Sequence, residues 1–126
     1  MKKYVLVSGS RTFYSREVVE LNIESFLRPG DVLMHGGASG VDIWASIAAE
    51  KVGADVWERR AAWDKYGKSA GIRRNRAMLD EITSYPNHMV LVFWNGYSKG
   101  TEHMLSLCNA TDVPYLLWEG PFGGGK

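Results

Sequence analysis

The sequence has little of several features that would place a protein in a specialised class. Its 126 residues contain one cysteine, so an internal disulfide is excluded and a reducing cytoplasm is the expected compartment. No apolar run approaches the roughly 18 residues that span a bilayer. The apolar stretch after the two N-terminal lysines is only four residues long, too short for a signal-peptide core. We therefore expect a cytoplasmic protein without a membrane partner.

A surplus of charge of one sign is also absent. Fifteen Lys and Arg residues stand against 14 Asp and Glu, giving a net charge of +1. This balance argues against broad attraction to nucleic acid. It still allows a local basic pocket, and residues 71–76 (GIRRNR) form the one dense basic cluster. Nucleic acid is therefore not an expected partner.

The common cofactor and nucleophile motifs are missing. His35, His88, His103 and Cys108 have no metal-ligand spacing, so we expect no metal. No segment matches the P-loop G-x-x-x-x-G-K-[ST], and none matches the dinucleotide fingerprint G-x-G-x-x-G. Nor is there a pattern for a serine nucleophile with its histidine and acid. No resident cofactor is expected.

Short apolar runs alternate with longer helical stretches. Continuous β-branched and apolar residues predict strands at 4–8, 31–35, 55–59, 88–94 and 113–118, with 55–59 at an edge and 88–94 central. Apolar residues at helical spacing predict helices at 16–27, 41–53, 72–83 and 101–112. Ser15 is expected to cap the first helix and Gly53 to end the second. The eleven-residue connection 61–71 is long for this arrangement and is a candidate binding loop.

Five strands with four intervening helices indicate an α/β fold. We predict a Rossmann-like, doubly wound parallel sheet of five strands in the order 3-2-1-4-5, with helices on both faces. Residues 1–119 are expected to form one domain and residues 120–126 a flexible tail.

Glycine-rich turns follow three of these strands, at SGSRTF (8–13), HGGASG (35–40) and WNGYSKGT (94–101). In the order 3-2-1-4-5 the three strands are neighbours, and such sheets bind ligands at the carboxyl ends of the strands. Glycine lets backbone N–H groups approach a ligand, and the N-terminus of each following helix favours an anion. One such turn alone is plain turn chemistry or a phosphate-binding loop. Three side by side predict a site for an anionic ligand.

The turns, the long connection and the start of the third helix supply the candidate ligand-binding residues. They offer backbone amides, hydroxyls, cationic groups and one aromatic ring. The predicted set is Gly9, Ser10, Arg11, Thr12, Gly36, Gly37, Ser39, Asp42, Trp63, Asp64, Arg74, Asn75, Gly96, Ser98, Gly100 and Thr101.

Several of these residues have structural alternatives. Asp42 either stabilises the helix dipole from the first turn or binds a ribose hydroxyl or orients an arginine. Asp64 is either a turn former or a contact to sugar or base, and Trp63 either stacks on a base or plugs the core. Arg74 and Asn75 are expected to open the third helix, where a basic residue opposes the dipole. That position favours a phosphate contact for Arg74.

Four motifs together resemble a known family. SGSRTF, HGGASGVD, W-x-x-YGKSAG-x-x-RN-x-x-M and FW-x-GYSKGT occur in the order and spacing of the small YspA/YpsA-like proteins of the SLOG superfamily. These are Rossmann-like domains related to the DprA and Lonely Guy proteins, and the resemblance covers residues 5–113. It implies a pocket for a nucleotide or a nucleotide-derived phosphorylated ligand, such as an ADP-ribose-like molecule or a cyclic dinucleotide. It also implies a homo-oligomer and a sensor, sequestering or processing role, often in conflict between phage and bacterium.

Lonely Guy enzymes are phosphoribohydrolases with the motifs R-K-x-x-M and G-G-x-G-T-x-x-E. By resemblance, Arg74 matches the arginine, but Met104 stands where the glutamate would be. Glu102 lies two residues earlier, about 200° away around the helix. The resemblance therefore implies binding rather than hydrolysis, or a different acid/base.

Two other functions stay open. One is a nucleotide N-glycosidase or phosphoribohydrolase, with Arg74, Asp42 and Glu102 as candidate catalytic residues. The other is binding of single-stranded nucleic acid, as in the DprA branch.

Overall fold

The computed structural model describes residues 1–120. They form one five-stranded, all-parallel sheet in the order β3-β2-β1-β4-β5. The strands are β1 (Tyr4–Gly9), β2 (Val32–His35), β3 (Asp55–Glu58), β4 (His88–Trp94) and β5 (Leu116–Glu119). The predicted Rossmann-like fold and strand order are confirmed. Of the predicted tail, only Gly120 belongs to the described residues, and residues 121–126 lie outside them.

The sheet is built around β1, which pairs with β4 from Tyr4↔His88 to Gly9↔Phe93. β1 is the middle strand, and β4 lies between it and β5, so residues 88–94 form an interior strand as predicted. Alternate residues of β1 enter two separate cores: Val5 and Val7 pack on one face and Leu6 on the other. Burial on both faces explains why the strand is continuously apolar.

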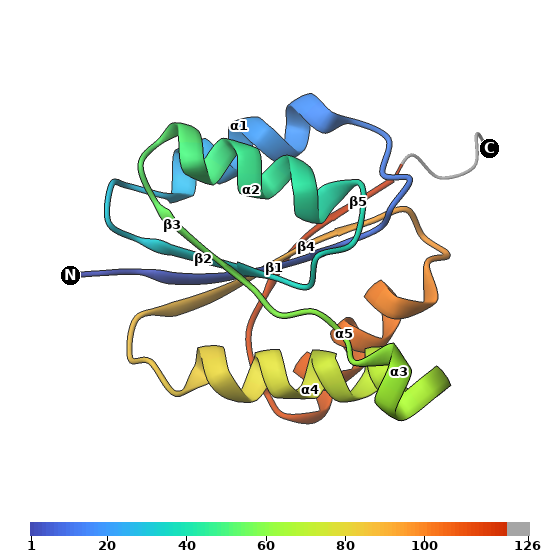
Figure 1. Ribbon diagram of the computed structural model, residues 1–126. Coiled ribbons are helices and arrows are strands. Elements are labelled where there is room, and N and C mark those ends of the chain that lie inside the picture. Colours follow the sequence, from blue (N-terminus) through green and yellow to red (C-terminus); the bar gives the residue numbers. More distant parts are fainter. Residues whose placement is uncertain (121–126) are drawn as a thin grey trace.

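Helices cover both faces of the sheet (Figure 1). On one face lie α1 (Arg16–Phe26) and α2 (Val41–Lys51), and on the other lie α4 (Ala70–Thr83) and α5 (Lys99–Ala110). No helix within residues 1–120 is long and apolar enough to cross a membrane.

The ends of the first two helices follow local chemistry. The Ser15 hydroxyl accepts the Val18 amide at 3.1 Å, so the predicted cap is confirmed. The C-cap of α2 is Val52, one residue before the predicted Gly53. Gly53 follows the C-cap in the left-handed region, at φ +86°. Its amide donates to the Glu50 carbonyl at 3.1 Å, which closes the last turn.

The connection at residues 61–71 is not an extended loop. It contains the short helix α3 (Trp63–Tyr66) and a 3-10 turn (Gly67–Ser69), and α4 begins at Ala70, earlier than predicted. Gly71 lies inside α4. A glycine suits this position because the Trp63 ring packs 3.3 Å from the place that a Cβ would take. Arg74 therefore lies in the second turn of α4 and does not open the helix, so the argument from an unfavourable dipole no longer applies to it.

Candidate functional site

A cavity of about 1020 Å³ opens at the carboxyl ends of β1, β2 and β4. Its walls come from the three glycine-rich turns and from α3 and α4, in the place where doubly wound sheets bind ligands. Most of the predicted site residues line it, namely Gly9, Arg11, Thr12, Gly36, Gly37, Ser39, Asp42, Trp63, Arg74, Asn75, Ser98, Gly100 and Thr101.

Four predicted residues do not line the cavity. Ser10 is fully buried beneath it, where its hydroxyl accepts the Asn95 amide at 3.0 Å and so ties the turn after β1 to the turn after β4. Gly96 lies at φ +93° in the turn itself, which explains the glycine there by backbone conformation. Asp64 is exposed on α3, and Glu102 is exposed on α5 with its carboxylate 4.0 Å from Lys99 Nζ.

The turn between β2 and α2 uses its own backbone amides. Asp42 Oδ2 accepts the amides of Gly36 and Ala38, each at 3.1 Å. His35 Nδ1 accepts the Gly37 amide at 2.9 Å. The amides of residues 36–38 are thus bonded to side chains of the same segment. The predicted phosphate cradle at Gly36 and Gly37 is corrected accordingly, because its donors are already engaged.

Packing explains two glycines of this turn. A Cβ on Gly36 would lie 2.3 Å from Arg74 Nη1, so the guanidinium occupies that space. Gly40 has φ +76°, and its Cβ would lie 2.4 Å from the Arg11 carbonyl oxygen. The glycines of HGGASG therefore admit an arginine and a neighbouring backbone, and close approach of a ligand is not needed to explain them.

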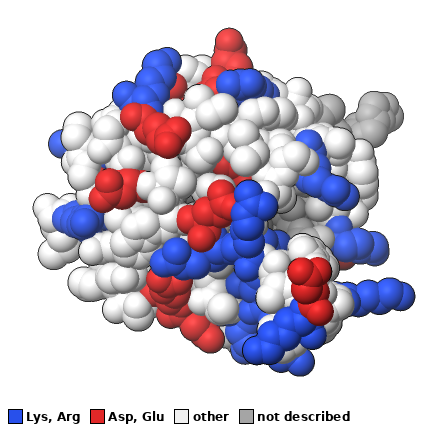
Figure 2. All heavy atoms as spheres, in the orientation of Figure 1, with Lys and Arg blue, Asp and Glu red and all other residues white. Residues whose placement is uncertain are grey.

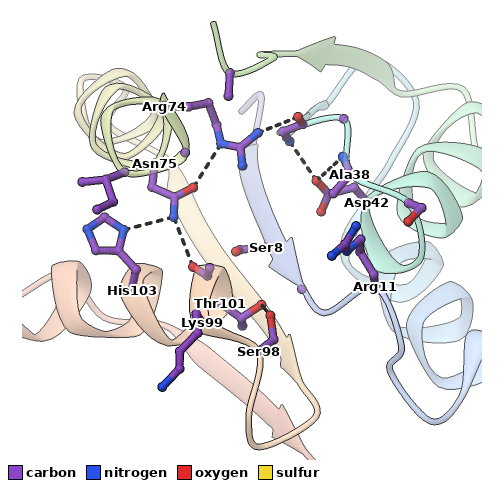
Figure 3. A pocket seen from close by; sticks show the side chains of 18 of the residues that line it. Ser8, Arg11, Ala38, Asp42, Arg74, Asn75, Ser98, Lys99, Thr101 and His103 are labelled. Atoms are coloured by element: carbon purple, nitrogen blue, oxygen red, sulfur yellow. Dashed lines mark hydrogen bonds between the residues drawn. The ribbon is translucent and has the colours of Figure 1, made fainter. Parts of the chain in front are cut away.

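Arg74 and Asn75 join the two walls of the cavity (Figure 3). Arg74 Nη1 donates to the Gly36 carbonyl at 2.6 Å, and its Nε donates to Asn75 Oδ1 at 3.1 Å. Asn75 Nδ2 donates to the Gly100 carbonyl at 3.1 Å and lies 3.1 Å from His103 Nδ1. Two adjacent residues of α4 thus hold the turn after β2 and the start of α5 in fixed relation. Arg74 Nη2 donates no hydrogen bond to any of residues 1–120, so this nitrogen is left as an unused donor.

Asp42 is the most perturbed carboxyl group of the site. It is 5% exposed, and burial raises its pKa to about 6, although the hydrogen bonds from Ala38 and Gly36 and the charge of Arg74 act in the opposite direction. Its Oδ1 is buried and has no hydrogen-bond partner among residues 1–120. Burial also lowers the pKa of His35 below its ordinary value. At neutral pH the turn therefore presents an ionised Asp42 and a neutral histidine.

The start of α5 has the opposite character. Asn95 Oδ1 accepts the amides of Tyr97 and Ser98 at 3.0 and 2.9 Å and shapes the preceding turn. Ser98 gives no side-chain cap to α5, and its hydroxyl lies 3.3 Å from that of Thr101. Within residues 1–120, the amides of residues 99–101 have no acceptor. This helix terminus therefore presents unpaired N–H donors and a partial positive charge at the cavity.

Comparison with known proteins shows a relationship to a phage protein. The chain is 32% identical over 120 residues to "Gene 61 protein" of Mycobacterium phage D29, and the alignment covers 89% of this chain and 93% of the phage protein. The chain belongs to the Gene 61 protein family. No family model matches it. The name Gene 61 protein states no activity, so the function of this family member has to be argued from its cavity.

The cavity of this Gene 61 family member is basic. Figure 2 shows Lys and Arg on much of the lower half of one face, with acidic residues among them. Asp42 is the one carboxylate among the lining residues, whereas the cationic lining residues are Arg11, Arg60, Lys68, Arg74 and Lys99. Arg60 is paired with Glu58. Among residues 1–120 no group of three His, Cys, Asp or Glu residues is placed to hold a metal ion. The charge of the cavity thus favours an anionic ligand.

Several lining residues of the family member were not predicted, among them Asn95, Tyr97 and His103. Asn95 and Tyr97 flank Gly96 in a turn already singled out, so the turn itself was the available signal. Burial, followed by the charge of Arg76, lowers the pKa of His103, and Asn75 Nδ2 fixes its Nδ1 as the acceptor. A lone histidine in a helix carries no pattern that would have identified it.

Proposed function

We propose that this protein binds a nucleotide or a nucleotide-derived phosphorylated ligand in the cavity. The observation that carries the proposal is the uncapped first turn of α5, whose three amides at residues 99–101 have no acceptor within residues 1–120 and adjoin a cavity rich in cationic groups. Helix N-termini of this kind bind phosphate through backbone N–H groups and the helix dipole. Hydroxyls of Ser98 and Thr101 stand beside those amides.

The opposite wall is less suited to phosphate. The amides of residues 36–38 are bonded to Asp42 and His35, and the Asp42 carboxylate would repel an anion at that helix start. We therefore assign the phosphate to α5, with the free Nη2 of Arg74 as a further donor. This assignment moves the phosphate away from HGGASG, the turn with the most glycines.

The rim of the cavity suits a base. Trp63 is 58% exposed and Tyr97 73% exposed, and both line the cavity together with Ile72. Exposed aromatic faces at a cavity rim stack on nucleobases. A phosphate on α5 and a base at this rim together describe a nucleotide.

The wider role rests on resemblance. We propose that the chain is a member of the SLOG superfamily and that it senses, sequesters or processes its ligand in conflict between phage and bacterium. Its kinship with a phage protein supports that setting. Hydrolysis is left out of the proposal because Met104 is buried in the core and Glu102 is exposed outside the cavity, so α5 supplies no carboxylate.

The test compares Gly100→Asp with Gly100→Asn. A Cβ at Gly100 has no atom within 4 Å, so both side chains fit, and an aspartate in the first turn favours the helix. Purified wild-type protein is first denatured and searched by mass spectrometry for a released nucleotide. Calorimetric titration with that molecule, or with a nucleotide panel at fixed low salt, then gives the affinities.

We expect the aspartate variant to bind at least tenfold more weakly than the asparagine variant, because two like charges about 4 Å apart repel by about 4 kcal/mol at an effective dielectric constant of 20. Equal affinities would remove the phosphate from α5. Failure of the whole panel to bind wild-type protein would reject nucleotide binding.

A further inference from the structure

The buried Oδ1 of Asp42 accepts no hydrogen bond from residues 1–120. It is the one buried side-chain nitrogen or oxygen within residues 1–120 that lacks a hydrogen-bond partner. The other carboxylate oxygen already accepts both amides of the turn. Buried polar atoms are nearly always paired, so an unpaired one at a cavity calls for a functional explanation.

A structural role would not require a charge here. An asparagine oxygen could accept the amides of Gly36 and Ala38 equally well and would avoid burying a negative charge. Instead the ionised group persists at neutral pH although burial disfavours it, as its raised pKa of about 6 records. Groups held at such an energetic disadvantage inside a cleft are typical of binding and catalytic sites.

The position of Asp42 indicates which part of a ligand it meets. Figure 3 places Asp42 and the start of α5 on different sides of the cavity, with Ser8 of β1 between them. Ser8 is 9% exposed and its hydroxyl lies among the lining groups. The aromatic side chains of Trp63 and Tyr97 line the same cavity and are exposed, whereas Ser8 and Asp42 are buried. A nucleotide with its phosphate on α5 and its base at the rim therefore presents its sugar to Asp42.

We propose that Asp42 Oδ1 accepts a hydrogen bond from a sugar hydroxyl of the ligand, so that the cavity selects ribose phosphates over their deoxyribose counterparts. The inference rests on the proposed nucleotide binding and names the class of nucleotide. An ionised carboxylate is an acceptor without a donor of its own. Removing the hydroxyl leaves the buried oxygen unpaired, and sites built to bond a hydroxyl reject analogues that lack it.

The experiment titrates the full chain with ribonucleoside 5′-monophosphates of the four common bases and with ADP-ribose. Each monophosphate is paired with its 2′-deoxy and its 3′-deoxy counterpart. For the base that binds best, we expect at least one deoxy form to bind about ten- to hundredfold more weakly, the range for loss of a hydrogen bond to a charged group. Equal binding of all three sugars would overturn the inference and leave nucleotide binding intact. Absence of binding by every probe would overturn both.

Asp42→Asn provides a second measurement. The amide oxygen must stay where it accepts Gly36 and Ala38, which places the NH₂ group at the Oδ1 position and turns an acceptor into a donor. The sugar hydroxyl then accepts from a neutral amide and no longer donates to a carboxylate, so the ratio of ribo to deoxy affinity should fall several-fold in this variant. Because the ratio is taken within one protein sample, a partly unfolded preparation does not affect it. A ratio unchanged from wild type would overturn the inference.

The pH dependence of the wild-type protein tests the inference without any variant. Charged or titratable groups near Asp42 are Arg74 from α4, Glu58 from β3, His35 from β2 and Arg11 from the turn after β1. Protonation of Asp42 below about pH 6 replaces the charged acceptor with a neutral carboxyl group, which bonds a hydroxyl more weakly, so the ribo-to-deoxy ratio should decrease there. The ligand phosphate also titrates near pH 6, but it is common to both sugars and cancels in the ratio. A ratio that stays constant from pH 8 to pH 5 would contradict the role of Asp42.

Discussion

Replacing Asp42 by Asn is expected to stabilise the folded protein at alkaline pH. The carboxyl group has a pKa of about 6 in the folded protein and 3.8 in an unfolded chain. Between these two values the folded state binds more protons than the unfolded state, so the free energy of unfolding falls as the pH rises. The penalty is complete above pH 6 and absent below pH 3.8. Asparagine resembles the protonated carboxyl and does not carry the penalty.

The size of the effect follows from the two pKa values. The rise of the pKa from 3.8 to about 6 corresponds to about 3 kcal/mol at pH 8. At pH 5 about half of this remains, because the folded carboxyl group is then mostly protonated. The variant should therefore gain up to about 3 kcal/mol over wild type at pH 8 and about half as much at pH 5.

Urea unfolding followed by circular dichroism at several pH values measures this difference. Asp31→Asn is the matched control, because Asp31 is also buried and accepts two backbone amides, those of Lys3 and Arg28, each at 2.9 Å. There burial raises the pKa, but the hydrogen bonds and charges of Lys3 and Arg28 lower it further, so the net pKa lies below 3.8. That carboxylate stabilises the fold above pH 3.8, and its replacement should destabilise it at neutral pH. Destabilisation by both variants, or a gain for Asp42→Asn that does not change with pH, would refute the reasoning.

Three further predictions concern the fold. Gly40→Ala should destabilise the protein by about 2–4 kcal/mol in urea unfolding. The φ of +76° is strained for alanine, and the Cβ would clash with the Arg11 carbonyl. A loss below about 1 kcal/mol would contradict this geometry. Ser15→Ala should lose about 1 kcal/mol with the cap to Val18, whereas Ser15→Asp should retain most of it; equal losses would show that the cap contributes little. The Cys108 thiol is buried, and burial raises its pKa to about 11. A thiol reagent at pH 8 should therefore label Cys108 only at the rate at which the protein unfolds. Rapid labelling of folded protein would disprove the burial of this thiol.

Much of the fold could be predicted because its signals are local. Continuous apolar runs identified the strands, and Ser15 stands where a helix needs an acceptor for the Val18 amide. The helical connection at 61–71 was missed because Gly67 and Gly71 resemble loop residues. Gly67 has a positive φ and does break the helix, whereas Gly71 makes room for the Trp63 ring inside a helix. A sequence does not distinguish these two uses of glycine.

The position of the cavity could be predicted from the three turns. Which of these turns keeps backbone amides free for a ligand could not be predicted. HGGASG looked most like a phosphate cradle, yet its amides are bonded to Asp42, six residues after Gly36, and to His35. The space at Gly36 is filled by Arg74, 38 residues further along the chain. Such competition for donors and space depends on tertiary contacts. The composition of a turn therefore indicates that anions could bind, while the three-dimensional contacts decide which amides remain.

The bonding of the HGGASG turn to its own side chains has a kinetic consequence. A glycine-rich loop with unpaired amides would sample many conformations. Each binding event would then have to order the loop, at a cost in conformational entropy. Here Asp42 and His35 have already fixed the turn, and the Arg74–Asn75 pair fixes its separation from α5. Association should then be a single step whose observed rate rises linearly with ligand concentration, without the plateau of a slow rearrangement.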